Sequence, residues 1–288
     1  MNRFSFTKYF EFVRFTHTVF ALPFALAAMA VACRETHGWP GWQRFLLIVT
    51  AMVCARTVAM GFNRIVDRRF DALNPRTENR HLPAGRITVQ SAYVLTCLSA
   101  GGLIVTAWFI NRICFALSPV ALVVVCFYSL TKRFTDFTHF FLGLALAAAP
   151  VGAWLAVTGK LAWSPIVLAI AVVFWLAGFD IIYATQDLAA DKIAGLHSLP
   201  VRWGLAGSLR FARWAHGAMW AALVGFGLIS GLRWAYFAGV MIIAACLVYE
   251  HRLARRGDPV SVNAAALRVN GVISVIFLMA VMADVMWR

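Results

Sequence analysis

Nine apolar runs, most with about the 20 residues that a helix needs to cross a bilayer, constrain this 288-residue chain more than any other feature. Because lipid offers no hydrogen bonds, only helices or closed barrels satisfy the backbone there, and runs of this length favour helices. We therefore predict an all-α, polytopic membrane protein: nine transmembrane helices in a bundle, with residues 1–288 forming a single domain. The runs cover residues 15–33, 45–62, 91–110, 113–130, 139–158, 163–182, 211–231, 234–249 and 262–286.

The composition agrees with a membrane protein and argues against a soluble one. Charged residues make up 13% of the chain, whereas soluble domains have roughly a quarter. The net charge of +14 raises the question of nucleic-acid binding, but such binding needs a contiguous basic face on a soluble domain. We therefore expect the lipid bilayer, and no nucleic acid, as the partner of this surface.

The basic residues predict how the chain is oriented in the membrane. With nine spans and a cytoplasmic N-terminus, 18 of the 26 Lys and Arg residues fall on the cytoplasmic side and 6 on the outer side. This asymmetry follows the rule that Lys and Arg accumulate in cytoplasmic loops. We predict a multi-pass protein of the cell (cytoplasmic or inner) membrane, with its N-terminus in the cytoplasm.

Two connections on the predicted cytoplasmic side are much longer than the others. They cover about residues 64–90 and 183–210, and both are rich in charge. Long connections in compact domains are usually functional. We expect them to cap the cytoplasmic end of the bundle.

The acidic residues are scarce, and five of the twelve lie in two segments next to these connections. Asn63, Asp67 and Asp71 recur every four residues, which places them on one stripe of a helix at the end of the second span. Asp187 and Asp191 repeat this spacing after the sixth span. Two such stripes at the same membrane depth suggest one shared site, although each stripe could also be a merely solvated helix end.

The chemistry of these stripes favours a metal-bound diphosphate. Tyr183 and Asp180 lie one and two turns below the second pair of acids. Carboxylates this close repel one another unless a positive group holds them together. Hard oxygen ligands, without the histidine spacing of a zinc site, favour Mg²⁺, which typically takes one or two carboxylates plus substrate phosphates.

Arg56 lies seven residues before Asn63, on the same stripe and about two turns deeper. A charged side chain inside a span is costly and is a functional candidate by default. The alternative is a structural hydrogen bond to a neighbouring helix. We favour that structural interpretation for Arg268, Asn263 and Asn270 in the ninth span, where no motif surrounds them.

Further basic residues surround the acids and are candidate partners for phosphate oxygens. Lys132 follows Tyr128 at the end of the fourth span and is the strongest candidate. Some of the others are expected to be topological anchors only. Those beside the first acidic motif are Arg64, Arg68, Arg76 and Arg80.

The chain resembles the UbiA superfamily of intramembrane prenyltransferases. Two segments carry most of the resemblance, residues 63–71 (NRIVDRRFD) and 180–191 (DIIYATQDLAAD). In residues 128–133, Ser129 stands where many members have proline. The other similar segments are residues 14–22, 74–77, 80–85 and 195–200.

The resemblance implies a nine-helix bundle around a central cavity, capped by the two cytoplasmic connections. It implies Mg²⁺ as cofactor, held by Asn63, Asp67, Asp71, Asp187 and Asp191, with the four aspartates as catalytic residues. Arg56 is added as a catalytic candidate because of its position within the second span. Polyprenyl diphosphate would ionise there, and an aromatic ring would attack the prenyl cation. The substrate-binding residues would be Lys132, Arg14, Asn63, Tyr128, Asp180, Tyr183 and Arg68, among which Arg14, together with Arg56, is a hypothetical partner of an acceptor carboxylate.

The acceptor is less well defined than the reaction. The resemblance is strongest to 4-hydroxybenzoate polyprenyltransferases of quinone biosynthesis and to a group that prenylates a naphthoate in the futalosine route to menaquinone. Homogentisate prenylation and haem farnesylation also stay open. From another class, a membrane transporter is the main alternative, since intramembrane charges also mark transport pathways. We expect no obligatory protein partner.

Overall fold

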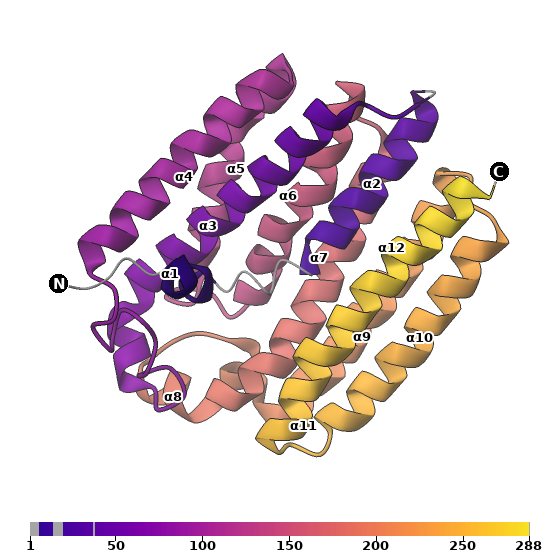
Figure 1. Ribbon diagram of the computed structural model, residues 1–288. Helices are drawn as coiled ribbons and strands as arrows, with labels where there is room; N and C mark the ends of the chain where they lie inside the picture. Colours follow the sequence, from indigo (N-terminus) through magenta and orange to yellow (C-terminus); the bar gives the residue numbers. More distant parts are fainter. Residues whose placement is uncertain (1–5, 14–19, 37, 288) are drawn as a thin grey trace.

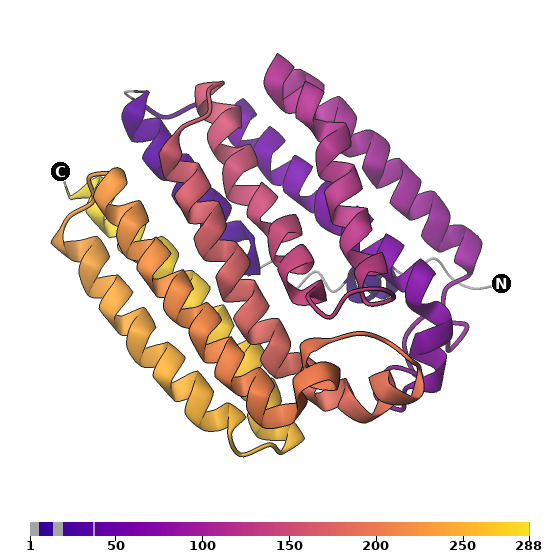
Figure 2. The ribbon, with the colours of Figure 1, turned by 180° about the vertical axis from the view of Figure 1, so that it is seen from behind.

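The computed structural model describes residues 6–13, 20–36 and 38–287, and all its regular elements in this part of the chain are helices (Figure 1). Nine of them match the nine predicted spans, which confirms the all-α class. Figures 1 and 2 show α4 and α5 on one side of the bundle and α9 and α10 on the opposite side. The elements are α1 (Phe6–Phe12), α2 (Leu22–Glu35), α3 (Trp42–Leu73), α4 (Val89–Ile110), α5 (Arg112–Thr131), α6 (Thr138–Thr158), α7 (Trp163–Ala184), the 3₁₀ turn η2 (Thr185–Asp187), α8 (Leu188–Ile193), α9 (Leu199–Ile229), α10 (Trp234–Ala254), α11 (Pro259–Asn263), the π-helical segment η3 (Ala264–Val269) and α12 (Asn270–Met286).

Most of these helices are suited to a bilayer, and the chain is a multi-pass membrane protein. Within the described residues, seven helical segments are long and apolar enough to cross a membrane. The two other matches to predicted spans are α2, with 14 residues, and α9, which carries three arginines in its first half. Gly204 in α9 has a φ of 65° and a non-helical ψ, so it kinks this helix near its start.

The helices that bear the acidic motifs run beyond the predicted spans. Helix α3 continues 11 residues past residue 62, and α9 begins 12 residues before residue 211. The connections expected at 64–90 and 183–210 therefore shrink to residues 74–88 and 194–198 between helices. The predicted spans are shorter because hydropathy detects only the lipid-covered part of a helix. Helix α3 ends at Leu73 because Pro75 disfavours a helical conformation at the preceding residue, and Asn74 is extended.

Small side chains let the central helices approach closely. Helix α2 lies between α6 and α12 with Ala25 and Ala28 fully buried. Phe24 on the same helix contacts both Trp175 of α7 and Phe277 of α12, with ring centroids 4.7 Å apart in each case. Membrane helices associate through such packing because lipid provides no hydrophobic force between them.

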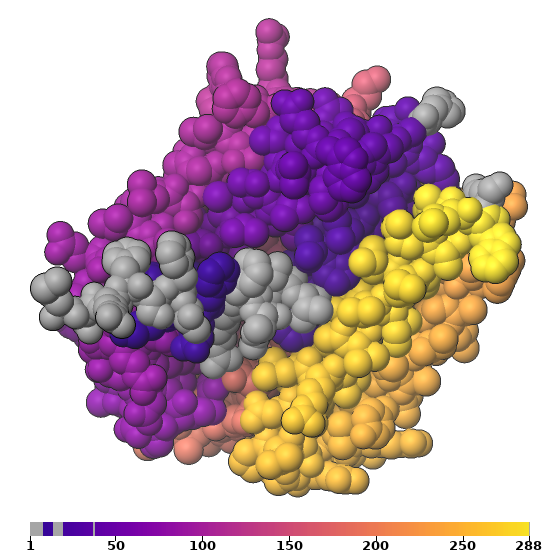
Figure 3. Space-filling view, viewed as in Figure 1, coloured from indigo at the N-terminus to yellow at the C-terminus, as the bar shows by residue number. Residues whose placement is uncertain are grey.

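The short helix α1 packs against α3 and the connection that follows it. Phe12 is buried with Ile65 of α3 and Ile87, and its ring meets the edge of the His81 ring. The Glu11 carboxylate lies 3.5 Å from His81 Nε2. The space-filling view in Figure 3 shows the face on which α1 lies, with α12 along one margin and α3 and α4 along the other. This contact fixes the connection after α3, which carries part of the candidate site.

Gly143 provides a test of the packing between α6 and α7. A Cβ atom at this position would lie 2.6 Å from the Val173 carbonyl oxygen, whereas a Cβ at Gly152 of the same helix meets nothing within 4 Å. We expect Gly143→Ala to destabilise the protein by roughly 1–3 kcal/mol through overpacking. The matched Gly152→Ala change should be neutral or stabilising by up to about 1 kcal/mol. Thermal unfolding in detergent measures both, and equal stability of the two variants would contradict this packing.

Candidate active site

The first acidic motif occupies the last turns of α3, as predicted. Asn63 Nδ2 donates a hydrogen bond of 2.8 Å to Asp67 Oδ2 one turn later. Asp71, a further turn along, is buried. The Thr77 hydroxyl donates to the Asp71 carbonyl oxygen at 2.9 Å, which turns the chain back over the end of the helix. All three motif residues therefore share one face and one rigid support.

The second motif is divided between the end of α7 and two short elements rather than placed on one continuous helix. Asp180 and Tyr183 lie on α7, Asp187 closes the 3₁₀ turn η2, and Asp191 lies on α8. Asp187 and Asp191 are both buried. The 3₁₀ turn at residues 185–187 interrupts the helix between Asp180 and Asp191, where the spacing in the sequence indicates regular helical turns.

The connection after α3 joins the two motifs through Asp187. Arg76 Nε donates to Asp187 Oδ1 at 2.8 Å, and Arg76 Nη2 donates to the other oxygen of the same carboxylate. Asn74 Nδ2 adds a third bond to Oδ1 at 2.9 Å, and Arg76 Nη1 donates to the Tyr183 hydroxyl at 2.7 Å. Burial alone would lower the pKa of Arg76, but the contacts with Asp187 and Tyr183 outweigh it and raise the pKa. A two-pronged pair of this kind is among the strongest and most directional polar contacts.

The acids of the first motif also face basic groups. Arg80 Nη1 donates to Asp71 Oδ1 at 2.5 Å, and Arg64 Nη1 lies 3.8 Å from the other oxygen. Arg133, at the end of α5, lies with Nη2 3.8 Å from Asp67 Oδ1. Arg64 and Arg80, for which the sequence leaves open a role as topological anchors only, therefore both face Asp71.

Lys132 lies between the two motifs. Its Nζ is 3.9 Å from Asp191 Oδ2. Burial would lower the pKa of Lys132, but the nearby carboxylates of both motifs raise it, so the ammonium form is maintained. The carbonyl oxygen of Lys132 accepts a 2.7 Å hydrogen bond from the backbone amide of His197, which links the end of α5 to the connection before α9.

Arg56 and Tyr128 form a deeper layer below the acids. Arg56 lies on α3 and Tyr128 on α5. Arg56, Arg64 and Asp67 are near enough to the Tyr128 phenol to act on it electrostatically. Along α3, the half-buried Arg56 therefore lies below the carboxylates, in the order that the sequence indicates.

One predicted residue, Arg68, is not paired with the acids in the described residues, and two unpredicted residues contact them. Arg14 lies outside the described residues, and Arg68 makes no ion pair in the part of the chain that the structure describes. Conversely, the buried His139 Nδ1 lies 2.7 Å from Asp180 Oδ2, and Asn74 contacts Asp187. The sequence could have indicated His139 only as a lone histidine at the start of the fifth span, on the same side of the membrane as Lys132.

The oxygen groups of both motifs fit a hard divalent cation. Asp71 Oδ2 and Asp191 Oδ2 are buried and have no hydrogen-bond partner in the described residues. No group of three or more His, Cys, Asp or Glu side chains in that part converges on one point. Any ion here would therefore complete its oxygen shell with ligands from outside the chain, as Mg²⁺ does with substrate phosphates.

Comparison with known proteins identifies the family. The sequence model of the UbiA prenyltransferase family matches residues 21–278. The chain therefore belongs to the UbiA prenyltransferase family, and it is an enzyme of the prenyltransferase class. The transporter alternative is thereby set aside.

Relatives with similar sequences include 4-hydroxybenzoate octaprenyltransferases. The protein of this name from Methylobacillus flagellatus is 30% identical over 86% of this chain and 83% of its own length. The one from Alkalilimnicola ehrlichii is 31% identical over 84% and 82%.

Solved structures of UbiA homologues share the fold. The apo structure of a homologue from Aeropyrum pernix has a TM-score of 0.84 at 27% identity, over 93% of this chain and 98% of that one. A homologue from Archaeoglobus fulgidus bound to GPP and Mg²⁺ has a TM-score of 0.75 at 23% identity, over 97% and 99%.

The contact between Arg76 and Asp187 predicts the mobility of the connection at residues 74–88. Arg76→Ala removes the charge-assisted bonds that hold it to η2, so we expect its backbone amides to exchange roughly tenfold faster with deuterated solvent. Arg69→Ala is the control, because Arg69 is exposed on α3 and has no ion pair in the described residues. Hydrogen exchange read by mass spectrometry compares the two variants. Unchanged exchange in Arg76→Ala would show that the pair does not hold the connection.

Proposed function

We propose that this enzyme transfers the polyprenyl group of a polyprenyl diphosphate to the aromatic acid 4-hydroxybenzoate in quinone biosynthesis, with Mg²⁺ as cofactor. The observation that carries the proposal is the meeting of two acidic motifs across one lysine, at the end of a membrane bundle. The names of the similar relatives support the aromatic acceptor.

The diphosphate would lie between the two motifs. Asn63, Asp67 and Asp71 on one side and Asp187 and Asp191 on the other would hold Mg²⁺, and their oxygen chemistry suits it. When bound, Mg²⁺ supplies positive charge to the diphosphate leaving group and orients it.

Basic side chains of the chain would complete the diphosphate site. Lys132 keeps its charge between the motifs and can contact phosphate oxygens directly. Arg76 and Arg80 already lie on Asp187 and Asp71, so each can exchange its carboxylate for a phosphate oxygen as substrate enters. His139 orients Asp180 below them.

The acceptor would bind deeper, beside Arg56 and Tyr128. Arg56 offers a guanidinium to the acceptor carboxylate, with Arg14 as a second candidate. A carboxylate held there would direct the electron-rich ring toward the allylic carbon as its C–O bond breaks. The apolar helices exclude water, which would otherwise capture the prenyl cation.

The orientation in the membrane follows from the same site. The ends of α3, α5 and α7 meet at the acidic motifs, and 11 of the 26 Lys and Arg residues lie within residues 64–90, 132–133 and 183–210 around them. We place this end in the cytoplasm, where soluble acceptor and diphosphate are handled, with the enzyme in the inner membrane and its N-terminus on the cytoplasmic side.

Removing one carboxylate from either motif tests the core of the proposal. We expect Asp67→Asn and Asp187→Asn each to lower Mg²⁺-dependent transfer by roughly a hundredfold or more, because the metal and its diphosphate lose a ligand. Glu78→Gln removes an exposed acid from the neighbouring connection and should leave the rate nearly unchanged. Membranes supplied with polyprenyl diphosphate, 4-hydroxybenzoate and Mg²⁺ provide the assay. Full transfer by either motif variant, or transfer that survives EDTA, would rule the mechanism out.

The role of Arg56 has a separate test. Arg56→Ala should raise the KM for 4-hydroxybenzoate by roughly tenfold to a hundredfold while leaving the KM for the donor nearly unchanged, since an ionic hydrogen bond to the acceptor is lost. Arg56→Lys retains the charge and should recover part of the loss. If only the donor KM rises, Arg56 serves the diphosphate and the acceptor assignment fails.

A further inference from the structure

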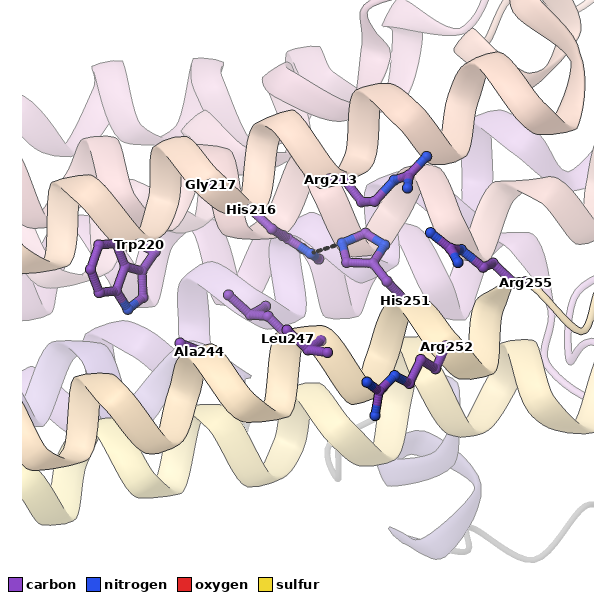
Figure 4. A pocket seen from close by; sticks show the side chains of 10 residues that line it. Arg213, His216, Gly217, Trp220, Ala244, Leu247, His251, Arg252 and Arg255 are labelled. Atoms are coloured by element: carbon purple, nitrogen blue, oxygen red, sulfur yellow. Dashed lines mark hydrogen bonds between the residues drawn. The ribbon is translucent and has the colours of Figure 1, made fainter.

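A second polar site lies between α9 and α10, and none of its lining residues belongs to the acidic motifs. It is a pocket of about 520 Å³ with ten lining residues. Figure 4 shows that the arginines and His251 gather toward one end of the pocket and Trp220 and Ala244 toward the other. The pocket is therefore charged at one end and apolar at the other along the helix axes.

Three arginines from two helices give the charged end its character. Arg213 comes from α9, Arg252 lies in the last turn of α10, and Arg255 caps that helix. All three are exposed, and none forms an ion pair with a carboxylate in the part of the chain that the structure describes. Such a concentration of unbalanced positive charge repels itself and favours an anion.

The neighbouring acid Glu250 is not available to neutralise these arginines. Glu250 is fully buried, and its Oε1 accepts a 2.8 Å hydrogen bond from Asn270 of α12. Its Oε2 lies 3.7 Å from His216 Nδ1, and the same nitrogen lies 3.0 Å from His251 Nε2. His216 Nε2 is 3.3 Å from the Trp175 carbonyl oxygen. This network holds His251 at the wall of the pocket and keeps the acid inside the bundle.

The other end of the pocket suits hydrocarbon. Ala244 and Leu247 are apolar, and they lie eight and five residues before Arg252, toward the middle of the membrane-crossing helix. The Trp220 indole Nε1 is already bonded to the Val240 carbonyl oxygen at 3.1 Å, so this side chain presents its ring rather than its donor.

The charged end of the pocket lies at the depth in the membrane that lipid headgroups occupy. Arg252 and Arg255 lie at the end of α10, directly before α11, and Figure 1 shows α11 at the same end of the bundle as α8. Arg213 follows the kink at Gly204 by nine residues. The arginines thus lie near the membrane surface, and the apolar wall extends into the bilayer.

We propose that this pocket binds the phosphate-bearing headgroup of an anionic membrane lipid, with the lipid's acyl chains against α9 and α10. Basic pockets between membrane helices bind such headgroups because charge attraction and acyl-chain contact act together. The site lies apart from the proposed prenyl-transfer site and does not depend on it.

Lipid binding to the purified full-length protein in a neutral detergent tests the proposal by native mass spectrometry. The probe is phosphatidylglycerol, with phosphatidylcholine as the neutral lipid. We expect phosphatidylglycerol to bind more tightly, and Arg213→Gln with Arg252→Gln to weaken its first binding step by about tenfold or more. The matched control is Arg210→Gln with Arg256→Gln, which removes two exposed arginines outside the pocket, one on α9 and one just after the end of α10, and should change binding by about twofold or less.

Several outcomes would overturn the proposal. Equal weakening by both pairs would show only general attraction to a basic surface. Equal binding of the two lipids would show that the arginines select no headgroup. Glycerol phosphate or inorganic phosphate binding as tightly as phosphatidylglycerol, with the same dependence on Arg213 and Arg252, would assign the pocket to a soluble anion.

Discussion

Charge balance at one end of the bundle is the constraint on which the rest of the structure depends. Acids at the end of a membrane helix are costly unless basic groups face them. Here the acids of the motifs on α3, η2 and α8 face bases that come from other segments. These contacts bind together α3, α5, the end of α7 and the connection between α3 and α4. The same charges that invite a diphosphate therefore also hold its site together before it binds.

The helices were largely predictable from the sequence, because apolar runs of bilayer length have few other stable outcomes. Their ends were not, since α3 continues through Asp67 and Asp71 after hydropathy has fallen. The four-residue spacing of Asn63, Asp67 and Asp71 did indicate that continuation. The break between Ala184 and Leu188 had no comparable signal, because a 3₁₀ turn and a helix place polar side chains at similar spacings.

Long-range partners could not be predicted, because they depend on how helices meet. Nothing adjacent to Asp187 in the sequence indicates Arg76, and nothing adjacent to Asp180 indicates His139. The same holds for Asn270, which was correctly expected to be structural. It accepts from the Trp175 indole at 2.6 Å and donates to Glu250, so it joins α7, α10 and α12.

The unbroken course of α3 has a consequence for how this enzyme can vary. One helix carries Arg56, Asn63, Asp67 and Asp71, and each added residue would rotate the later part of the helix by about 100° relative to the earlier part. A single insertion between Arg56 and Asn63 would thus turn the cation and the carboxylates to different faces. This helix therefore cannot change length between these residues, so its residue count is as much a part of the site as its side chains.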